Sequence, residues 1–221
     1  MPDNSPLSFY NMVILLMIAG TLPFVLTVVT SYCKIVVVIF LVRNALGVQQ
    51  VPPTIVLSAL AMILSVFVMA PVGVRMWEIA SQIELPAEMG LGTALDIGLS
   101  LSGPIHDFLQ ANCDERVTRA FMTAALRIWP SELHDLVDPD SALFVVPSFV
   151  ITELTKAFQI GFLLYLPFIC IDLIVSNILL ALGMMMVSPM AISLPFKLML
   201  FVTLDGWLKI SQGLMYSYSY G

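Results

Sequence analysis

Six ionisable residues of this 221-residue chain stand in or beside stretches that are otherwise apolar. A charged side chain in an apolar helix is costly, so it usually faces a partner group or a water-filled cavity. We predict buried or interface positions for these six, in which they form ion pairs or line an ion path: Lys34, Glu153, Lys156, Asp172, Lys197 and Asp205.

The sequence leaves open which of these residues pair with one another. Glu153 and Lys156 are three positions apart and can share one helix face, which predicts an ordinary ion pair worth a few tenths of a kcal/mol. Lys34 has two readings, since it can extend toward a membrane interface or pair with a buried partner.

A run of three methionines marks the stretch LLALGMMMVSPMAISLP, residues 179–195. Successive helical residues advance by about 100°, so three in a row cannot all lie on one face. This favours a loop or pore-lining role over plain packing, the ordinary role of most of the 14 methionines. The three methionines and the glycine and prolines that we expect to act as loop hinges are Met184, Met185, Met186, Gly183, Pro189 and Pro195.

Catalytic and metal-binding patterns are missing from the sequence. His106 and His134 have no cysteine, histidine or carboxylate at metal-ligand spacing. The three cysteines, Cys33, Cys113 and Cys170, show neither metal-ligand nor disulfide spacing. There is no nucleophile elbow, phosphate-binding loop or dinucleotide-binding loop. We therefore expect no enzyme activity, metal or cofactor, and a membrane-embedded enzyme is the least favoured class.

Composition indicates an all-α membrane protein. The chain is 59% apolar and 11% charged, whereas soluble domains average about 25% charged residues. Residues 4–33 and 44–74 carry no formal charge, and each window exceeds the roughly 20 residues that span a bilayer core. Residues 157–187 and 192–208 are two further apolar segments, broken by Asp172 and by Lys197 and Asp205 respectively. The sequence thus predicts about four long apolar helical segments, arranged as bent hairpins.

We divide the chain into three parts. Residues 1–77 form an N-terminal apolar hairpin, in which the first segment, residues 7–42, kinks near Pro23 and Pro53 opens the second, residues 54–77. Residues 78–146 form an acidic, partly helical section, and residues 147–221 form a C-terminal apolar hairpin that carries the methionine-rich loop. Pro167 and Asp172 are expected to interrupt the third apolar segment.

The acidic section is predicted to begin as a loose connection, because Pro86 and four glycines fall between residues 86 and 103. An amphipathic helix follows over residues 114–129, with Pro130 as its stop and a shorter turn over residues 131–137.

Charge placement predicts the orientation in the membrane. Residues 78–156 contain twelve acidic and four basic residues, whereas Lys34 and Arg43 flank the turn between the first two segments. The positive-inside rule places the Arg43 turn in the cytoplasm and the acidic section in the periplasm. The N-terminal residues 1–11 lack the basic region of a signal peptide, so we expect the first segment to be retained.

Three stretches of the sequence resemble one known family. RNALGVQQVPP (residues 43–53), PSFVITELTKAFQIGF (147–162) and LLALGMMMVSPMAISLPFKLMLFVTLDGW (179–207) closely resemble the flagellar export protein FliP and its injectisome counterpart SctR. The similarity spans nearly the whole chain and is weakest in the acidic section. The short acidic section and the lack of a signal peptide are more similar to the injectisome branch.

The resemblance implies a core subunit of the type III secretion export gate in the bacterial inner membrane. Several copies, in a five-fold-like arrangement, would surround a conduit for unfolded proteins with SctS-like and SctT-like subunits, in contact with SctU-like and SctV-like components. It assigns Met184, Met185 and Met186 to a pore gasket. The resemblance also implies that the apolar helices pack in an assembly that lies largely above the membrane plane. The energy for export would come from an ATPase and the proton-motive force, which act on other parts of the secretion machine. No nucleic acid is expected as a partner.

The main alternative is a small ion-coupled channel or transporter that uses Lys34, Asp172, Lys197 and Asp205. Such a function requires these groups to converge and favours an internal repeat of the helices. The two halves of the sequence show no convincing repeat.

Overall fold

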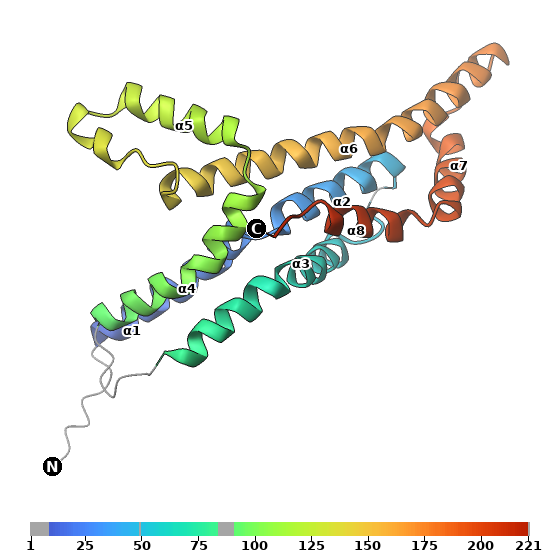
Figure 1. The fold of residues 1–221 in the computed structure, drawn as a ribbon. Helices are drawn as coiled ribbons and strands as arrows, with labels where there is room; N and C mark the ends of the chain where they lie inside the picture. Colours follow the sequence, from blue (N-terminus) through green and yellow to red (C-terminus); the bar gives the residue numbers. More distant parts are fainter. Residues whose placement is uncertain (1–8, 49, 84–90, 221) are drawn as a thin grey trace.

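The computed structural model of the protein describes residues 9–48, 50–83 and 91–220, and these residues contain helices and connections but no strand (Figure 1). The all-α prediction is therefore confirmed for the part of the chain that is described. In chain order the helices are α1 (Phe9–Val29), α2 (Tyr32–Leu46), α3 (Thr54–Gln82), α4 (Leu91–Asn112), α5 (Glu115–Ile128), the 3₁₀ helix η1 (Ser131–Leu136), α6 (Ala142–Ala181), α7 (Pro189–Thr203) and α8 (Gly206–Tyr216).

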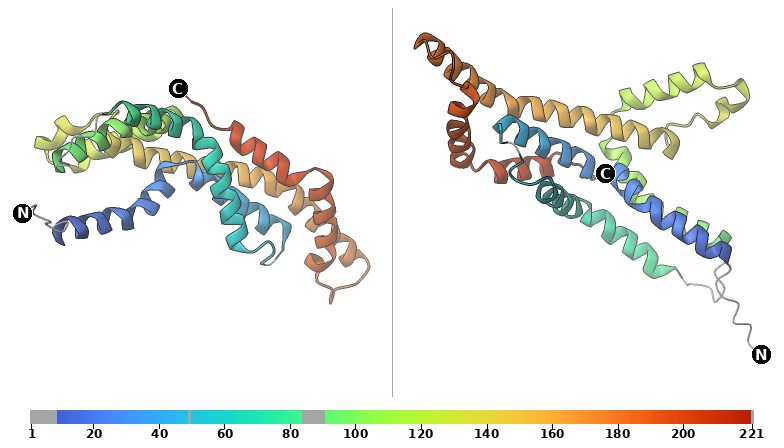
Figure 2. Two further views of the ribbon diagram at one scale, coloured as in Figure 1. Left: turned by 90° about the horizontal axis from the view of Figure 1, so that it is seen from below. Right: turned by 180° about the vertical axis from the view of Figure 1, so that it is seen from behind.

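Helix α6 is the longest element, and α2 lies along it (Figures 1 and 2). Its 40 residues give a length of about 60 Å at 1.5 Å per residue. Helix α2 buries a stripe at helical spacing, which consists of Ile35, Val38, Ile39 and Val42. This stripe forms the centre of the core between α2, α3 and α6.

Gly161 allows the close approach of α6 to α2. A Cβ atom at this position would lie 2.3 Å from Leu41 Cδ1 and 3.2 Å from Leu41 Cβ. Because the Leu41 Cβ is fixed to the α2 backbone, any side chain at residue 161 would push the two helices apart.

The predicted kink of the first segment is present, but its predicted position at Pro23 is wrong. Helix α1 continues through Pro23, and the chain bends by 79° between Pro23–Val29 and Tyr32–Leu46. The Tyr32 amide donates to the Thr30 hydroxyl at 3.3 Å, and the Ser31 hydroxyl donates to Ser65 Oγ at 3.0 Å. The first bond gives a backbone amide at the bend a side-chain acceptor, and the second ties the bend to α3.

The acidic section is more helical than predicted. Residues 91–112 form α4, which runs through Gly98, Gly103 and Pro104, so the expected loose connection is wrong there. Burial of Phe108 and Leu109 in the core offsets the cost of about 1 kcal/mol for each helical glycine. Residues 84–90, which include Pro86, lie outside the described residues.

The amphipathic helix after α4 is confirmed as α5, with η1 as the shorter turn. Asp114 caps α5, because its side chain accepts a hydrogen bond from the Arg116 amide at 2.9 Å. Hydrogen bonds from the Arg116 side chain and backbone hold the pKa of the Asp114 carboxyl at about 2. The cap therefore stays ionised down to acidic pH.

The predicted interruption of the third segment is wrong. Helix α6 is continuous through Pro147, Pro167 and Asp172. An apolar setting favours this continuity, because backbone groups that leave a helix there find no water to replace their hydrogen bonds.

The last apolar segment divides at Asp205 into α7 and α8, whereas Lys197 lies inside α7. Helices α7 and α8 meet at 59°, and Asp205 adopts a left-handed conformation with φ of 51°. A Cβ at the next residue, Gly206, would lie 2.4 Å from the Phe201 ring. The glycine therefore permits the fold-back that sets Phe201 edge-on against Trp207, with ring centroids 5.2 Å apart.

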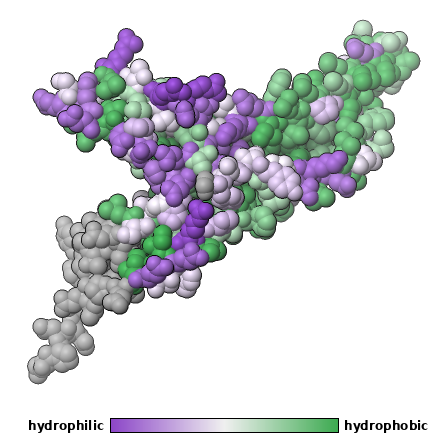
Figure 3. Space-filling model, in the orientation of Figure 1, coloured by the Kyte–Doolittle hydropathy of each residue, from purple (hydrophilic) through white to green (hydrophobic). Residues whose placement is uncertain are grey.

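The four predicted apolar segments are confirmed. Helices α3 and α6 are each long and apolar enough to cross a membrane, and the number of such spans rises to as many as four if each bent pair forms one. Figure 3 shows hydrophilic residues over the α5 region and a hydrophobic surface over the far half of α6 and over α7. Apolar side chains are also exposed on other helices, including Phe24 on α1 and Trp77 on α3.

We expect Gly161→Val to lower the free energy of unfolding by about 1–3 kcal/mol, because its side chain would overpack the α2–α6 contact. Thermal unfolding in detergent measures the effect, and Leu41→Ala should restore part of the loss. Gly73→Val is the matched control, since a Cβ at this helical position meets nothing within 4 Å. Equal stability of the two glycine variants would contradict the packing argument.

Candidate functional site

A buried ion pair joins α2 to α6. Lys34 Nζ lies 3.2 Å from Glu153 Oε1, and both side chains are 0% exposed. Lys156, one helical turn after Glu153, lies 3.8 Å from the same oxygen and is itself partly exposed. The ion pair thus connects two helices through residues that are 119 positions apart in the chain.

Tyr218, which follows the end of α8, contacts both members of this ion pair. Its hydroxyl donates to Glu153 Oε2 at 2.5 Å and lies 3.1 Å from the Ser31 carbonyl oxygen. The single hydroxyl proton favours the carboxylate, which is the closer and charged acceptor. Lys34 Nζ lies 3.5 Å from the centroid of the Tyr218 ring, a cation–π contact. Burial and the neighbouring Glu153 charge raise the pKa of Tyr218, so its hydroxyl remains a donor.

The two residues after Tyr218 are also bonded to the core. Asn112, at the end of α4, donates to the Ser219 carbonyl at 2.9 Å and accepts from the Ser219 amide at 3.0 Å. The Tyr220 hydroxyl bonds to the Val68 carbonyl of α3. Lys156 Nζ donates to the Asn112 carbonyl at 3.0 Å, which ties α6 to the same point. We call Tyr218, Ser219 and Tyr220 the C-terminal clasp, which lies where α2, α4 and α6 meet (Figure 1).

A second ion pair lies further along α6. Lys197 Nζ of α7 lies 2.6 Å from Asp172 Oδ2 and 3.3 Å from the Ala45 carbonyl at the end of α2. The Ser193 hydroxyl donates to Asp172 Oδ1 at 2.6 Å. Asp172 and Glu153 are 19 residues apart on α6, which separates the two pairs by about 28 Å along the helix. The structure therefore places the charges in two separate clusters.

Asp205 joins neither cluster. It lies exposed at the break between α7 and α8, and no ion pair to it is formed by the residues that the structure describes. The six ionisable residues thus divide into one trio, one pair and one exposed carboxylate.

The three methionines lie in the turn between α6 and α7, at the far end of the hairpin (Figure 1). Gly183 ends α6 in a left-handed conformation, with φ of 72°, and the Met184 amide bonds back to the Leu179 carbonyl at 2.9 Å. This ending favours glycine because the left-handed conformation strains other residues. Pro189 begins α7, whereas Pro195 lies inside it. Met185 is 81% exposed and Met186 is fully exposed.

The two histidines serve local contacts. His106 Nε2 lies 2.6 Å from the Asp140 carbonyl oxygen, and His134 Nε2 lies 3.2 Å from that of Trp129. Within the described residues, no three histidine, cysteine or carboxylate side chains come together as a metal site requires.

Comparison with known proteins identifies the family. The sequence pattern of the FliP family matches residues 15–214. The chain belongs to the FliP family. The Yop proteins translocation protein R of Yersinia pestis is 46% identical to it over 210 residues, which cover 94% of this chain and 95% of that protein. The resemblance drawn from the three sequence stretches is therefore confirmed.

Two further relatives of this FliP-family chain carry names from secretion and virulence. The hypersensitivity response secretion protein HrcR of Ralstonia nicotianae is 44% identical over 212 residues, which cover 95% of this chain and 97% of that protein. The virulence protein YscR of Salmonella typhimurium is 42% identical over 219 residues, 99% of each chain.

The residues that complete the first ion pair of this FliP-family chain could not be predicted from the sequence. Tyr218, Asn112 and Ser31 are separated from Glu153 by between 41 and 122 residues. The only available signal was the aromatic and polar run SYSYG, and such a run is typical of an ordinary exposed end.

We expect Lys34→Met to lower the free energy of unfolding by about 3–5 kcal/mol, because it leaves the buried Glu153 charge without its closest cation. Adding Glu153→Gln to this variant should recover part of the loss, since the remaining group is then neutral. Lys209→Met, at an exposed position of α8, is the matched control. Thermal unfolding compares these variants with wild type and with Glu153→Gln alone, and additive effects of the two substitutions would contradict a coupled pair.

We expect Tyr218→Phe to cost about 1.5–3 kcal/mol, the range for a hydrogen bond to a charged group, because the aromatic contacts are kept. Tyr216→Phe is the control, since Tyr216 is 82% exposed. Unfolding in detergent compares the two substitutions. Indistinguishable midpoints would show that the clasp hydroxyl does not stabilise the pair.

Proposed function

We propose that this chain is a core subunit of the type III secretion export gate. Several copies, in a five-fold-like arrangement with SctS-like and SctT-like subunits, would surround the conduit for unfolded proteins across the bacterial inner membrane. Membership of the FliP family supports this proposal, as do relatives named for translocation and secretion. Contacts with SctU-like and SctV-like components and a periplasmic acidic section belong to the same proposal.

The observation that carries the proposal is the exposed methionine turn at the end of the α6–α7 hairpin. The side chains of Met185 and Met186 are exposed and pack against no core of the single chain. The backbone of their turn is nevertheless fixed by Gly183 and by backbone hydrogen bonds. Flexible apolar side chains on a fixed turn can repack around different polypeptides and close again into a dry seal. A ring of such turns would form the gasket of the closed conduit.

The apolar outer surface supports assembly with other subunits. Phe158, Phe162 and Leu163 are exposed on α6, as are Ile63 and Phe67 on α3. Large apolar side chains exposed in such numbers mark surface that lipid or partner chains cover. The far half of α6, where Figure 3 shows the most hydrophobic surface, adjoins the proposed gasket.

The ion-coupled transporter is less well supported. That function needs its ionisable groups to converge on one path. Lys34 and Lys197 each pair with a nearby carboxylate, in clusters separated by about 28 Å along α6. Two neutralised pairs are typical of fixed links between helices.

Replacement of Met184, Met185 and Met186 by alanine should leave assembly intact and raise the small-ion conductance of the closed complex, because shorter side chains cannot fill the constriction. Electrical recording from the expressed complex measures this. A double Met62→Ala and Met199→Ala variant is the matched control, since both methionines are exposed on helices outside the turn. Unchanged conductance in a correctly assembled triple variant would refute the gasket.

Affinity purification in mild detergent tests the partner assignment separately. We expect small partner membrane proteins and further copies of the chain to co-purify with it. Recovery of a stable monomer alone, under conditions shown to preserve membrane complexes, would contradict the export-gate function.

A further inference from the structure

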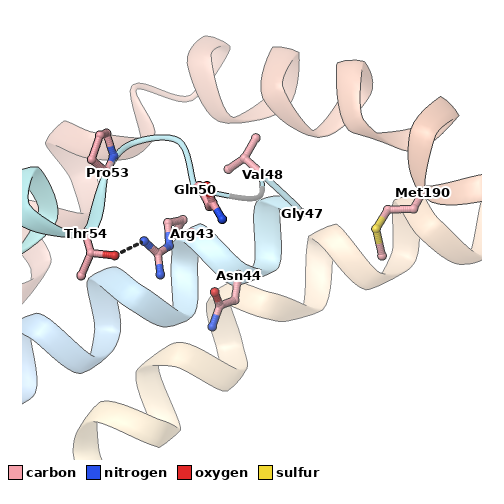
Figure 4. A pocket seen from close by; sticks show the side chains of 8 residues that line it. All are labelled: Arg43, Asn44, Gly47, Val48, Gln50, Pro53, Thr54 and Met190. Carbon is pink, nitrogen blue, oxygen red and sulfur yellow. Dashed lines mark hydrogen bonds between the residues drawn. The ribbon is translucent and has the colours of Figure 1, made fainter.

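An open pocket lies at the turn between α2 and α3, beside the first residues of α7 (Figure 4). Its volume of about 860 Å³ is within the range of small-molecule sites. Polar side chains come from both helices and from the turn, and apolar contacts come from the turn and from α7. The residues that matter here are Arg43, Asn44, Gln50 and Thr54, with Val48 and Met190.

Arg43 gives the pocket its charge. Its Nη1 donates to the Thr54 hydroxyl at 3.0 Å, and its guanidinium carbon lies 5.2 Å from the Phe40 ring. A guanidinium has five N–H donors, so this bond leaves donors available to a ligand. No acidic residue lines the pocket, and among the described residues no carboxylate forms an ion pair with Arg43.

The neighbouring groups leave this charge uncompensated. Lys197, on the far side of Gly47, is neutralised by Asp172. The amides of Asn44 and Gln50 are neutral and can donate hydrogen bonds. A cation with amide and hydroxyl donors and no acid selects an anionic ligand.

The surroundings of the pocket favour a lipid over a free anion. Val51, Ile55 and Val56 are exposed immediately beside it, at the turn and at the first residues of α3. The pocket also lies at the ends of two apolar helices, the position at which membrane segments reach the headgroup region. A single carboxylate or phosphate would contact only the polar lining and would leave this apolar surface open.

We infer that this pocket binds the headgroup phosphate of an anionic phospholipid through Arg43, with the acyl chains along the exposed face of α3. Basic pockets at the ends of membrane helices bind anionic headgroups in this way. The binding does not depend on the proposed export function, because it needs only the α2–α3 turn and the start of α7.

The test uses the full chain in phosphatidylcholine nanodiscs that contain a small fraction of phosphatidylglycerol, with retained lipid measured by native mass spectrometry. We expect wild-type protein to retain phosphatidylglycerol preferentially and Arg43→Gln to reduce this retention about fivefold, the effect of one arginine at an anionic surface. Arg75→Gln, which removes an exposed charge at another position of α3, should retain the lipid as wild type does.

Arg43→Lys separates binding from folding, because it replaces the guanidinium that bonds to Thr54 and keeps a positive charge in the pocket. Retention in this variant should lie well above that of Arg43→Gln, and a loss equal to that of Arg43→Gln would overturn the inference. Displacement of the lipid by inorganic phosphate would assign the site to a free anion. Unchanged lipid retention in Arg43→Gln, with loss of a co-purifying partner subunit, would assign the pocket to a partner carboxylate instead.

Discussion

The buried pair of Lys34 and Glu153 is the constraint on which the rest of the structure depends. Removing two charges from water costs several kcal/mol each, and the cost is recovered only when the geometry is good and the remaining hydrogen-bonding positions are filled. Lys34 donates a hydrogen bond to one oxygen of the Glu153 carboxylate, and Tyr218 donates to the other. Because these groups come from α2, α6 and the C-terminal clasp, satisfying one carboxylate fixes the relative positions of three distant segments.

The buried core of the single chain is small compared with its exposed apolar surface. Its buried stripe on α2 is narrow, whereas large side chains on α3, α6 and α7 remain exposed. At about 60 Å, α6 is roughly twice as long as the bilayer core is thick. A straight crossing would therefore leave much of this apolar helix outside the hydrocarbon. This length supports an assembly in which neighbouring subunits cover part of the surface.

The sequence predicted the helical segments well because apolar runs and helix caps are local signals. Helix α3 begins at Thr54, directly after the proline that predicted this start, and α5 lies within the predicted range of residues 114–129. Proline and glycine were weaker guides, since α4 and α6 continue through them. A proline removes one backbone hydrogen bond from a helix. In apolar surroundings a break in the helix would cost more, because the freed backbone groups would find no water to bond to.

The ionisable residues were visible in the sequence, but their pairing was not. Glu153 and Lys156 are neighbours on a helix, whereas the closest cation to Glu153 is Lys34, from an earlier hairpin. Only the three-dimensional arrangement of α2 against α6 defines that contact. The methionine turn was predictable, because three successive residues cannot share one helix face and Gly183 supplies the helix ending.

The clasp has a consequence for the order in which the molecule is made. Tyr218 follows Ser31, Lys34 and Glu153 in the chain, so it is synthesised after every group that it contacts in the buried network. Until it arrives, the Glu153 carboxylate lacks one of its hydrogen bonds and α2 is held to α6 by an incomplete pair. The buried network is therefore complete only once Tyr218 has been synthesised, and a chain that stops before Tyr218 lacks the hydrogen bond to Glu153 Oε2.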